Sequence, residues 1–240
     1  EEALREAAAA IGSPLRVSGE DWRAGWDGEA FVFVDERIAV RTPWLGLLGR
    51  RQAENAGCAL AALQTLGDPR LTPDILSEGL RAVQWPGRLQ PLAEGPLTAG
   101  GGAPVWLDAA HNPAGAAMLA EAIRAARPPV SPDGWRDRAA LVLAVQASKD
   151  AGAMLEALRG EVDDVIACPL PDSGGQEGGP GADPAHLASA ARALGLHALT
   201  AEDFRAGLRL ARASRASRIY VAGSVYLVGA VLAANGERID

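Results

Sequence analysis

The stretch that most constrains the fold runs from Pro104 to Pro113 and reads PVWLDAAHNP. Its apolar run, Val105–Leu107, is typical of a strand that is covered on both faces of a sheet. Asn112 is a good helix N-cap, and Pro113 suits the first helical position because a missing N–H costs nothing there. The stretch therefore predicts a buried strand that ends at a polar cluster and is followed at once by a helix.

Strands and helices alternate from this stretch to the end of the sequence. The predicted strands are Val105–Asp108, Ala139–Val145, Asp163–Cys168 and Arg218–Ala222, and the predicted helices are Pro113–Arg127, Ala151–Arg159, Pro184–Leu194, Ala201–Ala213 and Val225–Ala234. Such alternation predicts an α/β fold with a Rossmann-like, mostly parallel sheet and flanking helices. Open sheets of this kind bind their ligands at the carboxyl ends of the strands.

The preceding residues follow another pattern. Two runs rich in β-branched and aromatic residues flank Asp35-Glu36 and predict a β-hairpin. The other predicted elements are helices at 1–11, 49–66 and 72–83 and short strands at 15–17 and 44–48. Pro86-Gly87 then breaks the helical pattern. We expect a domain boundary here, which gives domains of residues 1–84 and 85–240.

Charge and hydropathy exclude several classes of protein. The net charge of −7 argues against a general nucleic-acid-binding surface. The apolar run Ile219–Ala234 is shorter than a bilayer span and is interrupted by Gly223 and Gly229, so we expect no membrane partner. Cys58 and Cys168 are far apart in apolar surroundings, as free thiols in a cytoplasmic protein would be. The absence of an initiating Met predicts a fragment of a longer chain.

Asp108 and His111 are the first candidate functional residues, because both follow a buried strand. A carboxylate three residues before an imidazole can bind a metal, orient a ribose or pair with an amine. Alternatively, Asp108 only caps the turn and His111 only bonds a neighbouring loop. Ser224 follows another strand and is read as a helix N-cap, beside backbone amides that can meet a carboxylate.

Arg88 and Asn55 are less specific by themselves. Arg88 follows a stiff Pro-Gly turn and can present its guanidinium to a phosphate, or it can simply be solvated. Asn55 lies on the polar side of a predicted helix, where it can contact an adenine edge or face water. The glycine-rich stretch Ser173–Gly181 lacks the Gly-Lys-Ser/Thr ending of a phosphate loop and predicts a mobile surface loop.

Four motifs in this order are more specific than any one of them. They are Gly49-Arg50-Arg51-Gln52-Ala53-Glu54-Asn55-Ala56, Trp85-Pro86-Gly87-Arg88, Leu107-Asp108-Ala109-Ala110-His111-Asn112-Pro113 and Gly223-Ser224-Val225-Tyr226-Leu227. Together they resemble the bifunctional folylpolyglutamate synthase/dihydrofolate synthase family of the Mur ligase superfamily. The resemblance covers nearly the whole chain. It implies that residues 1–84 end a central ATPase domain and that residues 85–240 form a C-terminal glutamate-ligase domain.

The resemblance also implies an activity and a role for each site residue. It implies an ATP-dependent ligase that adds L-glutamate to dihydropteroate or folate through an acyl phosphate, with Mg²⁺ as cofactor. Asn55, Arg88 and Asp108 match the family's ATP contacts. His111 and Ser224 match positions that hold the incoming glutamate, and His111 and Asp108 are the expected catalytic residues. The implied partners are small molecules, and the implied state is a monomer in the cytoplasm.

The chain departs from the family at Ala109, where Gly is usual, and at Arg51, where His is frequent. The family's phosphate loop and magnesium ligands are expected upstream of residue 1, so no metal ligand is assigned here and the chain alone is expected to be inactive. Two alternatives remain. One is another Mur-type amide ligase, acting on a peptidoglycan precursor or on cyanophycin. The other is a non-catalytic module that binds a nucleotide or an amino acid.

Overall fold

The structure, a computed structural model, describes residues 2–129, 137–171 and 179–237. The chain divides into two compact units, Glu1–Trp85 (the N-terminal unit) and Pro86–Asp240 (the C-terminal unit), and each is described by itself. The boundary expected from the sequence lies one residue before this division. Within the described residues, no helix combines the length and apolar character needed to cross a membrane.

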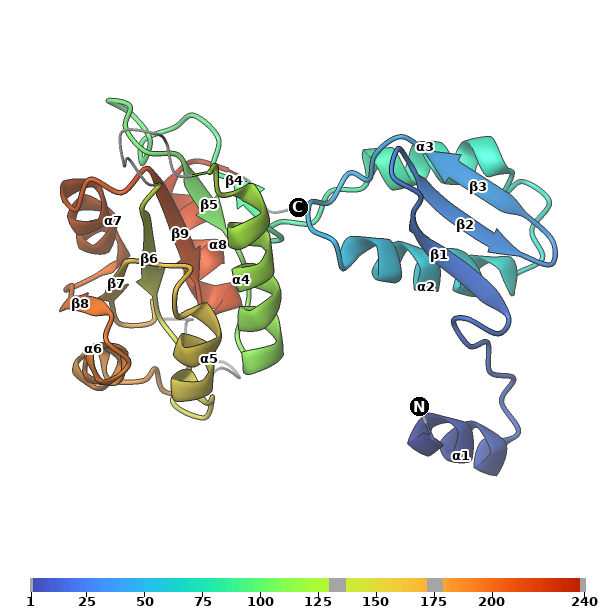
Figure 1. The fold of residues 1–240 in the computed structure, drawn as a ribbon, viewed down its shortest axis with the longest axis horizontal. Helices are drawn as coiled ribbons and strands as arrows, with labels where there is room; N and C mark the ends of the chain where they lie inside the picture. Colours follow the sequence, from blue (N-terminus) through green and yellow to red (C-terminus); the bar gives the residue numbers. More distant parts are fainter. Residues whose placement is uncertain (1, 130–136, 172–178, 238–240) are drawn as a thin grey trace. The chain divides into compact units, whose positions relative to one another are not determined.

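The C-terminal unit is built on a six-stranded sheet (Figure 1). Its strands lie in the order β4 (Gln90–Pro91), β5 (Val105–Leu107), β9 (Arg218–Ala222), β6 (Ala139–Leu143), β7 (Asp164–Ala167) and β8 (His197–Thr200). Only β4 runs antiparallel to its neighbour, and the other pairs are parallel. The predicted α/β fold with a mostly parallel sheet is confirmed.

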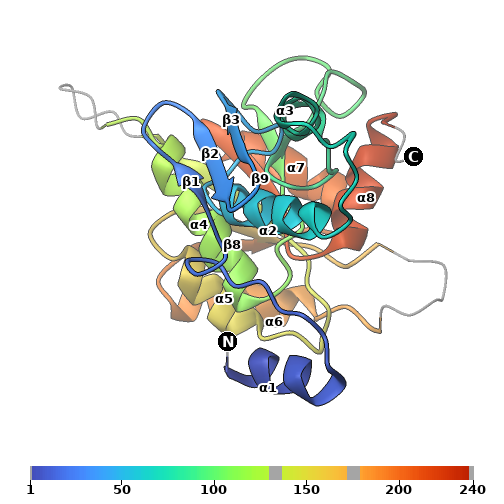
Figure 2. The ribbon, with the colours of Figure 1, turned by 90° about the vertical axis from the view of Figure 1, so that its right-hand side faces the viewer.

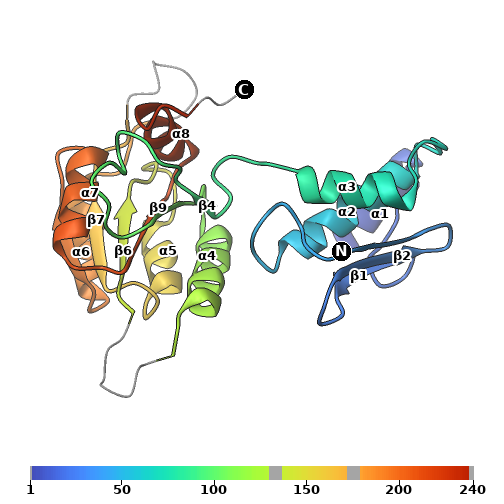
Figure 3. The same ribbon diagram turned by 90° about the horizontal axis from the view of Figure 1, so that it is seen from above.

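Five helices of the described residues cover the two faces of this sheet (Figure 3). They are α4 (Pro113–Ala126), α5 (Ala151–Leu158), α6 (Pro184–Ala193), α7 (Phe204–Ala213) and α8 (Val225–Ala234). The apolar residues of α4, α5 and α6 share one core, and those of α7 and α8 share the other. The central strand β6 alternates between them, since Leu141 and Leu143 enter the first core while Ala140 and Val142 enter the second.

Helix starts follow the capping residues of the sequence. Asn112 accepts a hydrogen bond from the Gly115 amide at 2.8 Å, with Pro113 at the first helical position of α4. In the same way, the Asp203 carboxylate accepts from the Ala206 amide at 2.7 Å at the start of α7. These bonds satisfy amides that have no partner inside the helix. The predicted N-cap role of Asn112 is confirmed.

The N-terminal unit contains a three-stranded antiparallel sheet, β1 (Trp22–Trp26), β2 (Phe31–Asp35) and β3 (Ala39–Thr42). Helices α2 (Gln52–Gln64) and α3 (Pro73–Ala82) pack on it (Figure 2). Phe31 and Phe33 are fully buried in the core that the sheet and these helices share. Helix α1 (Glu2–Ile11) has no buried residue. The predicted hairpin is confirmed as β2 and β3.

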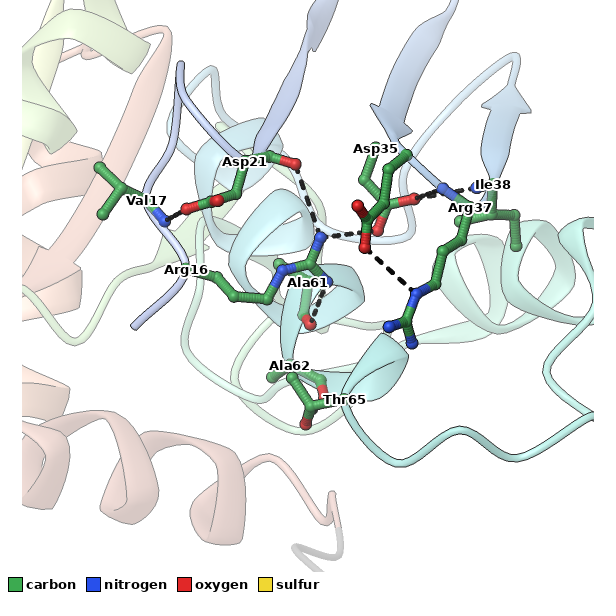
Figure 4. A network of polar contacts seen from close by, with 10 residues as sticks. Arg16, Val17, Asp21, Asp35, Arg37, Ile38, Ala61, Ala62 and Thr65 are labelled. Atoms are coloured by element: carbon green, nitrogen blue, oxygen red, sulfur yellow. Dashed lines mark hydrogen bonds and ion pairs between the residues drawn. The ribbon is translucent and has the colours of Figure 1, made fainter. Parts of the chain in front are cut away.

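A partly buried ion pair fixes the segment before β1 (Figure 4). Arg16 donates to Asp35 Oδ2 at 2.9 Å and to the Ala61 carbonyl at 3.3 Å. Asp35 Oδ1 accepts from the amides of Arg37 and Ile38, each at 2.9 Å. Burial raises the pKa of Asp35, but these hydrogen bonds outweigh it and hold the pKa below its ordinary value of 3.8. The ion pair therefore ties this segment to the hairpin turn through Asp35 and to α2 through Arg16.

Two predicted strands are wrong, and the strands β1, β4 and β8 have no counterpart among the predicted ones. Residues 15–17 form no strand, because the Asp21 carboxylate binds the Val17 amide at 2.6 Å and closes a turn there. Residues 44–48 instead pack against α3, where the Gly46 amide donates to the Leu80 carbonyl at 2.8 Å. Strands β1 and β8 were missed because neither carries an apolar run. Residues 173–178 of the predicted glycine-rich loop lie outside the described residues.

Candidate functional site

The candidate site lies at the carboxyl ends of β5 and β9, which are adjacent parallel strands. β5 leads into α4 on one face of the sheet, and β9 leads into α8 on the other face. In doubly wound sheets, ligands bind where the chain leaves two neighbouring strands toward opposite faces of the sheet. The loops after β5 and β9 are such a place. The Ala110 carbonyl accepts from the Gly223 amide at 2.8 Å and so joins the two loops directly.

Asp108 is the first residue after β5, and its carboxylate already has two backbone partners. Oδ1 accepts from the Ala110 amide at 2.9 Å, and Oδ2 accepts from the Leu89 amide at 3.0 Å. Burial raises the pKa of Asp108 above its ordinary 3.8, while the two amides and the nearby Arg88 charge act in the opposite direction. The half-buried carboxylate thus keeps lone pairs for a ligand, although part of its capacity is used within the fold.

His111 lies one residue before the N-cap of α4 and is half-buried. Its Nδ1 is 2.9 Å from the Ala109 carbonyl oxygen. Since a carbonyl oxygen only accepts, Nδ1 must carry the proton of this bond. In the neutral ring Nε2 is then the accepting nitrogen, so it is the atom that His111 can present to a ligand amine.

Arg88 is exposed on a tight turn that is fastened to β5. The Gly87 carbonyl accepts from the Ala109 amide at 2.7 Å, and Leu89 binds Asp108 as described. Both turn neighbours have left-handed backbones, with φ of +72° at Gly87 and +46° at Leu89. A non-glycine residue adopts this conformation at a cost, so the hydrogen bonds must hold it there. They bring the Arg88 charge beside the Asp108 carboxylate.

Ser224 is buried and caps α8, as the sequence predicts. Its Oγ accepts from the Tyr226 amide at 3.1 Å, which leaves its hydroxyl proton free to be donated. The preceding Gly223 has a φ of +109°, and a Cβ there would lie 2.4 Å from the Ala144 carbonyl oxygen. Only glycine fits this close approach, so the turn before Ser224 requires glycine at this position.

Asn55 belongs to the N-terminal unit. It is exposed on α2, and its Nδ2 donates to Gln52 Oε1 at 2.9 Å. The structure therefore brings Arg88, Asp108, His111 and Ser224 together in one unit and describes Asn55 separately. Among the described residues, no group of three His, Cys, Asp or Glu side chains is arranged to hold a metal ion.

Several residues that shape this site were not predicted. Leu89 and Ala110 act through backbone amides, and Gln90 accepts the Gly87 amide at 2.9 Å through its side chain. The Pro-Gly pair signals a turn, but nothing in the sequence signals that the turn lies against Asp108. The contact between Leu89 and Asp108 joins residues 19 positions apart, so local patterns do not predict it.

The fold defines the class of protein, an α/β domain in which the loops after β5 and β9 lead to helices on opposite faces of the sheet. Proteins of this class bind their ligands at such a switch point. The chain belongs to the dihydrofolate synthetase family, because the family model for "Dihydrofolate synthetase, C-terminal domain" matches residues 97–234.

Named relatives agree with this membership. The chain is 36% identical over 180 residues to the probable bifunctional folylpolyglutamate synthase/dihydropteroate synthase of Halobacterium salinarum, covering 71% of this chain and 19% of that protein. It is 33% identical over 230 residues to a protein of the same name from Haloferax volcanii, covering 91% and 24%. The chain thus spans a quarter or less of these two curated relatives.

Solved structures share the fold. Folylpolyglutamate synthase from Mycobacterium tuberculosis, complexed with ADP and AMPPCP, matches with a TM-score of 0.79 and 25% identity. The match covers 100% of this chain and 53% of that one. E. coli FolC, in complex with DHPP and ADP, matches with a TM-score of 0.78 and 23% identity over 97% of this chain and 50% of that one. The second likeness shows the fold alone.

Proposed function

We propose that this chain is the C-terminal portion of an ATP-dependent ligase that adds L-glutamate to dihydropteroate or folate. Residues 1–84 would end its central ATPase domain, and residues 85–240 would form its glutamate-ligase domain. The observation that carries the proposal is the pairing of β5 with β9 in a chain of this family. The loops that follow these strands carry Asp108, His111 and Ser224 and are joined by a hydrogen bond, and the Arg88 charge lies near Asp108. Arg88 and Asp108 offer a cation and a carboxylate to a nucleotide. His111 and Ser224 offer an imidazole and a capped helix start to an amino acid.

The nucleotide contacts in this proposal are Arg88, Asp108 and Asn55. An exposed guanidinium on a fixed turn can donate to phosphate oxygens in a fork. Asp108 keeps free lone pairs for a ribose hydroxyl beside its two backbone partners. Asn55, on α2, is proposed to contact the adenine. The M. tuberculosis relative in complex with ADP and AMPPCP supports a nucleotide as substrate.

The glutamate contacts are His111 and Ser224. Nε2 of His111 can accept from the amine of the incoming glutamate, because Nδ1 is committed to the Ala109 carbonyl. Ser224 can donate its hydroxyl proton to a glutamate carboxylate at the positive end of α8. The two residues leave adjacent strands, so they can hold one small amino acid from two sides.

The reaction would proceed in two steps. The pteroate or folate carboxylate attacks the terminal phosphate of ATP and gives an acyl phosphate and ADP. The glutamate amine then attacks the acyl carbon, and phosphate leaves from the tetrahedral intermediate as the amide forms. Arg88 would stabilise charge on the phosphate, and His111 would hold the amine near the acyl carbon. Burial in a closed site would keep water from the acyl phosphate.

Mg²⁺ enters the proposal only as the ion bound to the substrate ATP. The described residues offer no set of three ligands for it, so no step is assigned to the metal here. The relative from Yersinia pestis is described in complex with AMPPNP and Mn ion.

We also propose that the protein acts as a monomer in the cytoplasm, where ATP and folates are available. Light scattering of the purified protein tests the monomer.

The experiment uses the protein encoded by the complete open reading frame. It is incubated with ATP, Mg²⁺, L-glutamate and dihydropteroate or a reduced folate, and the product is identified by its mass while phosphate release is measured. We expect a product heavier by one glutamate, formed only when all substrates are present. The 240-residue chain alone, assayed in parallel, is expected to be inactive.

Other outcomes would overturn the proposal in distinct ways. Ligation only to a peptidoglycan precursor or a cyanophycin primer would make the protein another amide ligase. Saturable binding of ATP or glutamate without any product would make it a binding module. A His111→Ala variant with an unchanged KM for glutamate would refute the assigned contact.

A further inference from the structure

The turn that carries Arg88 is held from two sides. On the β5 side, the Leu89 amide donates to Asp108 and the Gly87 carbonyl accepts from Ala109. On the other side, the Gly87 amide donates to Gln90 Oε1 at 2.9 Å. Gln90 is half-buried at the start of β4 and lies two residues from Arg88. Both neighbours of Arg88 therefore have their amides bound by side chains.

Gln90 is itself held by the segment that follows α8. Its Nε2 donates to Glu237 Oε2 at 3.1 Å. Glu237 Oε1 accepts from the Ala93 amide and from Asn235 Nδ2, each at 3.2 Å. Asn235 is buried, and its Oδ1 accepts from the Leu97 amide at 3.0 Å. A continuous set of hydrogen bonds thus joins the end of α8 to the turn.

The polarity of this set permits only one orientation of the Gln90 amide. The Gly87 amide needs an acceptor, and the Glu237 carboxylate needs a donor. A glutamine supplies both when Oε1 faces Gly87 and Nε2 faces Glu237. The flipped amide would place donor against donor and acceptor against acceptor. Gln90 is therefore matched to its two neighbours and is not an interchangeable polar residue.

Helix α8 also contacts the turn directly. A Cβ at Gly87 would lie 2.7 Å from Cγ1 of Val228, so this side chain fills the space beside the turn. The same helix begins at Ser224, which is proposed to hold glutamate. The position of α8 therefore sets the position of the turn through Val228 along the helix and through Glu237 and Gln90 at its end.

We propose that Gln90 is a positioning residue for Arg88, and that Gln90 and Glu237 set the affinity for ATP without touching it. The inference rests on the proposed function, since Arg88 is taken as a phosphate contact. Gln90 acts through the Gly87 amide, which fixes the direction in which the next side chain leaves the turn. Without the hydrogen bond between Gly87 and Gln90, the Arg88 guanidinium is still present but is no longer held toward the phosphates of ATP.

The test is a polarity exchange in the protein from the complete open reading frame. Gln90→Glu keeps the acceptor for Gly87 but sets a second carboxylate against Glu237. We expect KM for ATP to rise about two- to tenfold, the equivalent of one lost hydrogen bond, with kcat and the KM for glutamate nearly unchanged. Adding Glu237→Gln supplies a donor to the new carboxylate while its Oε1 still accepts from Ala93, so KM for ATP should return toward the parent value.

Two further variants separate positioning from general destabilisation. In an Arg88→Ala background, Gln90→Glu should raise KM for ATP no further, because its effect passes through Arg88. Gln64→Glu, which adds the same charge in the N-terminal unit, should leave KM for ATP unchanged. Melting temperatures of all variants are measured alongside to confirm that each is folded.

Each outcome decides the inference. A folded, active Gln90→Glu protein with the parent KM for ATP would overturn it. So would failure of the double variant to recover, or effects of Gln90→Glu and Arg88→Ala that simply add. If the parent protein does not use ATP at all, the proposed function fails and the inference fails with it. An active parent with an unresponsive Gln90 refutes the inference alone.

Discussion

Single residues at the β5 edge are held by backbone geometry as much as by side-chain chemistry. Asp108, expected as a nucleotide contact, also accepts the amides of Leu89 and Ala110. A substitution at Asp108 would therefore both remove a proposed ligand contact and loosen the turn beneath Arg88. The assigned roles of Asn55, Arg88, Asp108, His111 and Ser224 stay predictions, while their placement is now known.

Gly87→Ala should destabilise the protein and disturb ATP use. Gly87 has a φ of +72°, and an added Cβ would lie 2.7 Å from Val228 Cγ1. We expect a loss of about 1–3 kcal/mol in the free energy of unfolding, measured by urea denaturation. Gly152→Ala is the control, because that glycine lies in α5 with only an ordinary contact at 3.5 Å. It should be neutral or stabilise by up to about 1 kcal/mol, and an equal loss in both variants would contradict the argument.

At the scale of elements, a residue at a helix start can stabilise the helix by capping it, and it can also bind a ligand. Ser224 and Asp203 cap α8 and α7, two helices that pack in the same core of the sheet. Only the start of α8 lies at the proposed glutamate site. The pair therefore offers a comparison in which the structural cost is similar and the functional cost differs.

Ser224→Ala and Asp203→Ala should each lower the free energy of unfolding by about 1 kcal/mol, because each removes an N-cap. Only Ser224→Ala should also raise the KM for glutamate, by roughly tenfold for one lost contact. Steady-state kinetics of the complete protein and thermal melts measure the two effects. Equal KM values in both variants would remove Ser224 from the proposed site.

The amino ends of the strands carry a different polar cluster. Asp164, at the start of β7, accepts from Arg138 at 2.8 Å and is 2.6 Å from Nδ1 of His197 at the start of β8. Burial raises the pKa of Asp164, but these hydrogen bonds outweigh it and the pKa lies below 3.8. His197 thus joins the edge strand β8 to its neighbour β7 through Asp164.

Because the folded-state pKa of Asp164 is lowered, its stabilisation is complete above pH 4 and is lost as pH falls through the folded pKa. Asp164→Asn should cost about 1–3 kcal/mol at pH 7. The difference from the parent should shrink below pH 3.8, as measured by denaturation at several pH values. Asp68→Asn, which removes an exposed pair with Arg70, should have almost no effect. A difference that grows at low pH would refute the assignment.

At the scale of the whole molecule, the two units differ in how much they bury. The C-terminal unit has a core on each face of its sheet, whereas the N-terminal unit has a single core between three strands and two helices. Small folds bury a smaller fraction of their surface and are correspondingly less stable. The two units should therefore differ in their ability to fold alone.

Residues 86–240, produced alone, should fold cooperatively. We expect one sigmoidal urea transition by circular dichroism, since all six strands and both cores lie within this unit. Residues 1–85 alone should unfold at a lower urea concentration or show no cooperative transition. A fragment 86–240 that lacks cooperative unfolding, while the intact chain retains it, would contradict the division of the chain.

The sequence by itself determined what depends on neighbours along the chain. The periodicity of apolar residues located the main strands, and the caps Asn112 and Ser224 located helix starts, because these signals involve residues within four positions. The motifs also led to the family. The strands β1 and β8 were not predicted from the sequence, because each forms by pairing with a neighbouring strand and lacks a strand-like composition of its own.

Only the tertiary structure decided which of these elements meet. The pairing of β9 beside β5 brings the loop that carries Ser224 against the loop that carries Asp108 and His111, although more than a hundred residues separate them. The left-handed Leu89 and the hydrogen bonds of Gln90 are likewise set by contacts with Asp108 and Glu237. Hydrogen bonds between distant segments produce no periodic pattern in the sequence. The residue types therefore predicted the chemistry, whereas the tertiary structure determined which residues lie together.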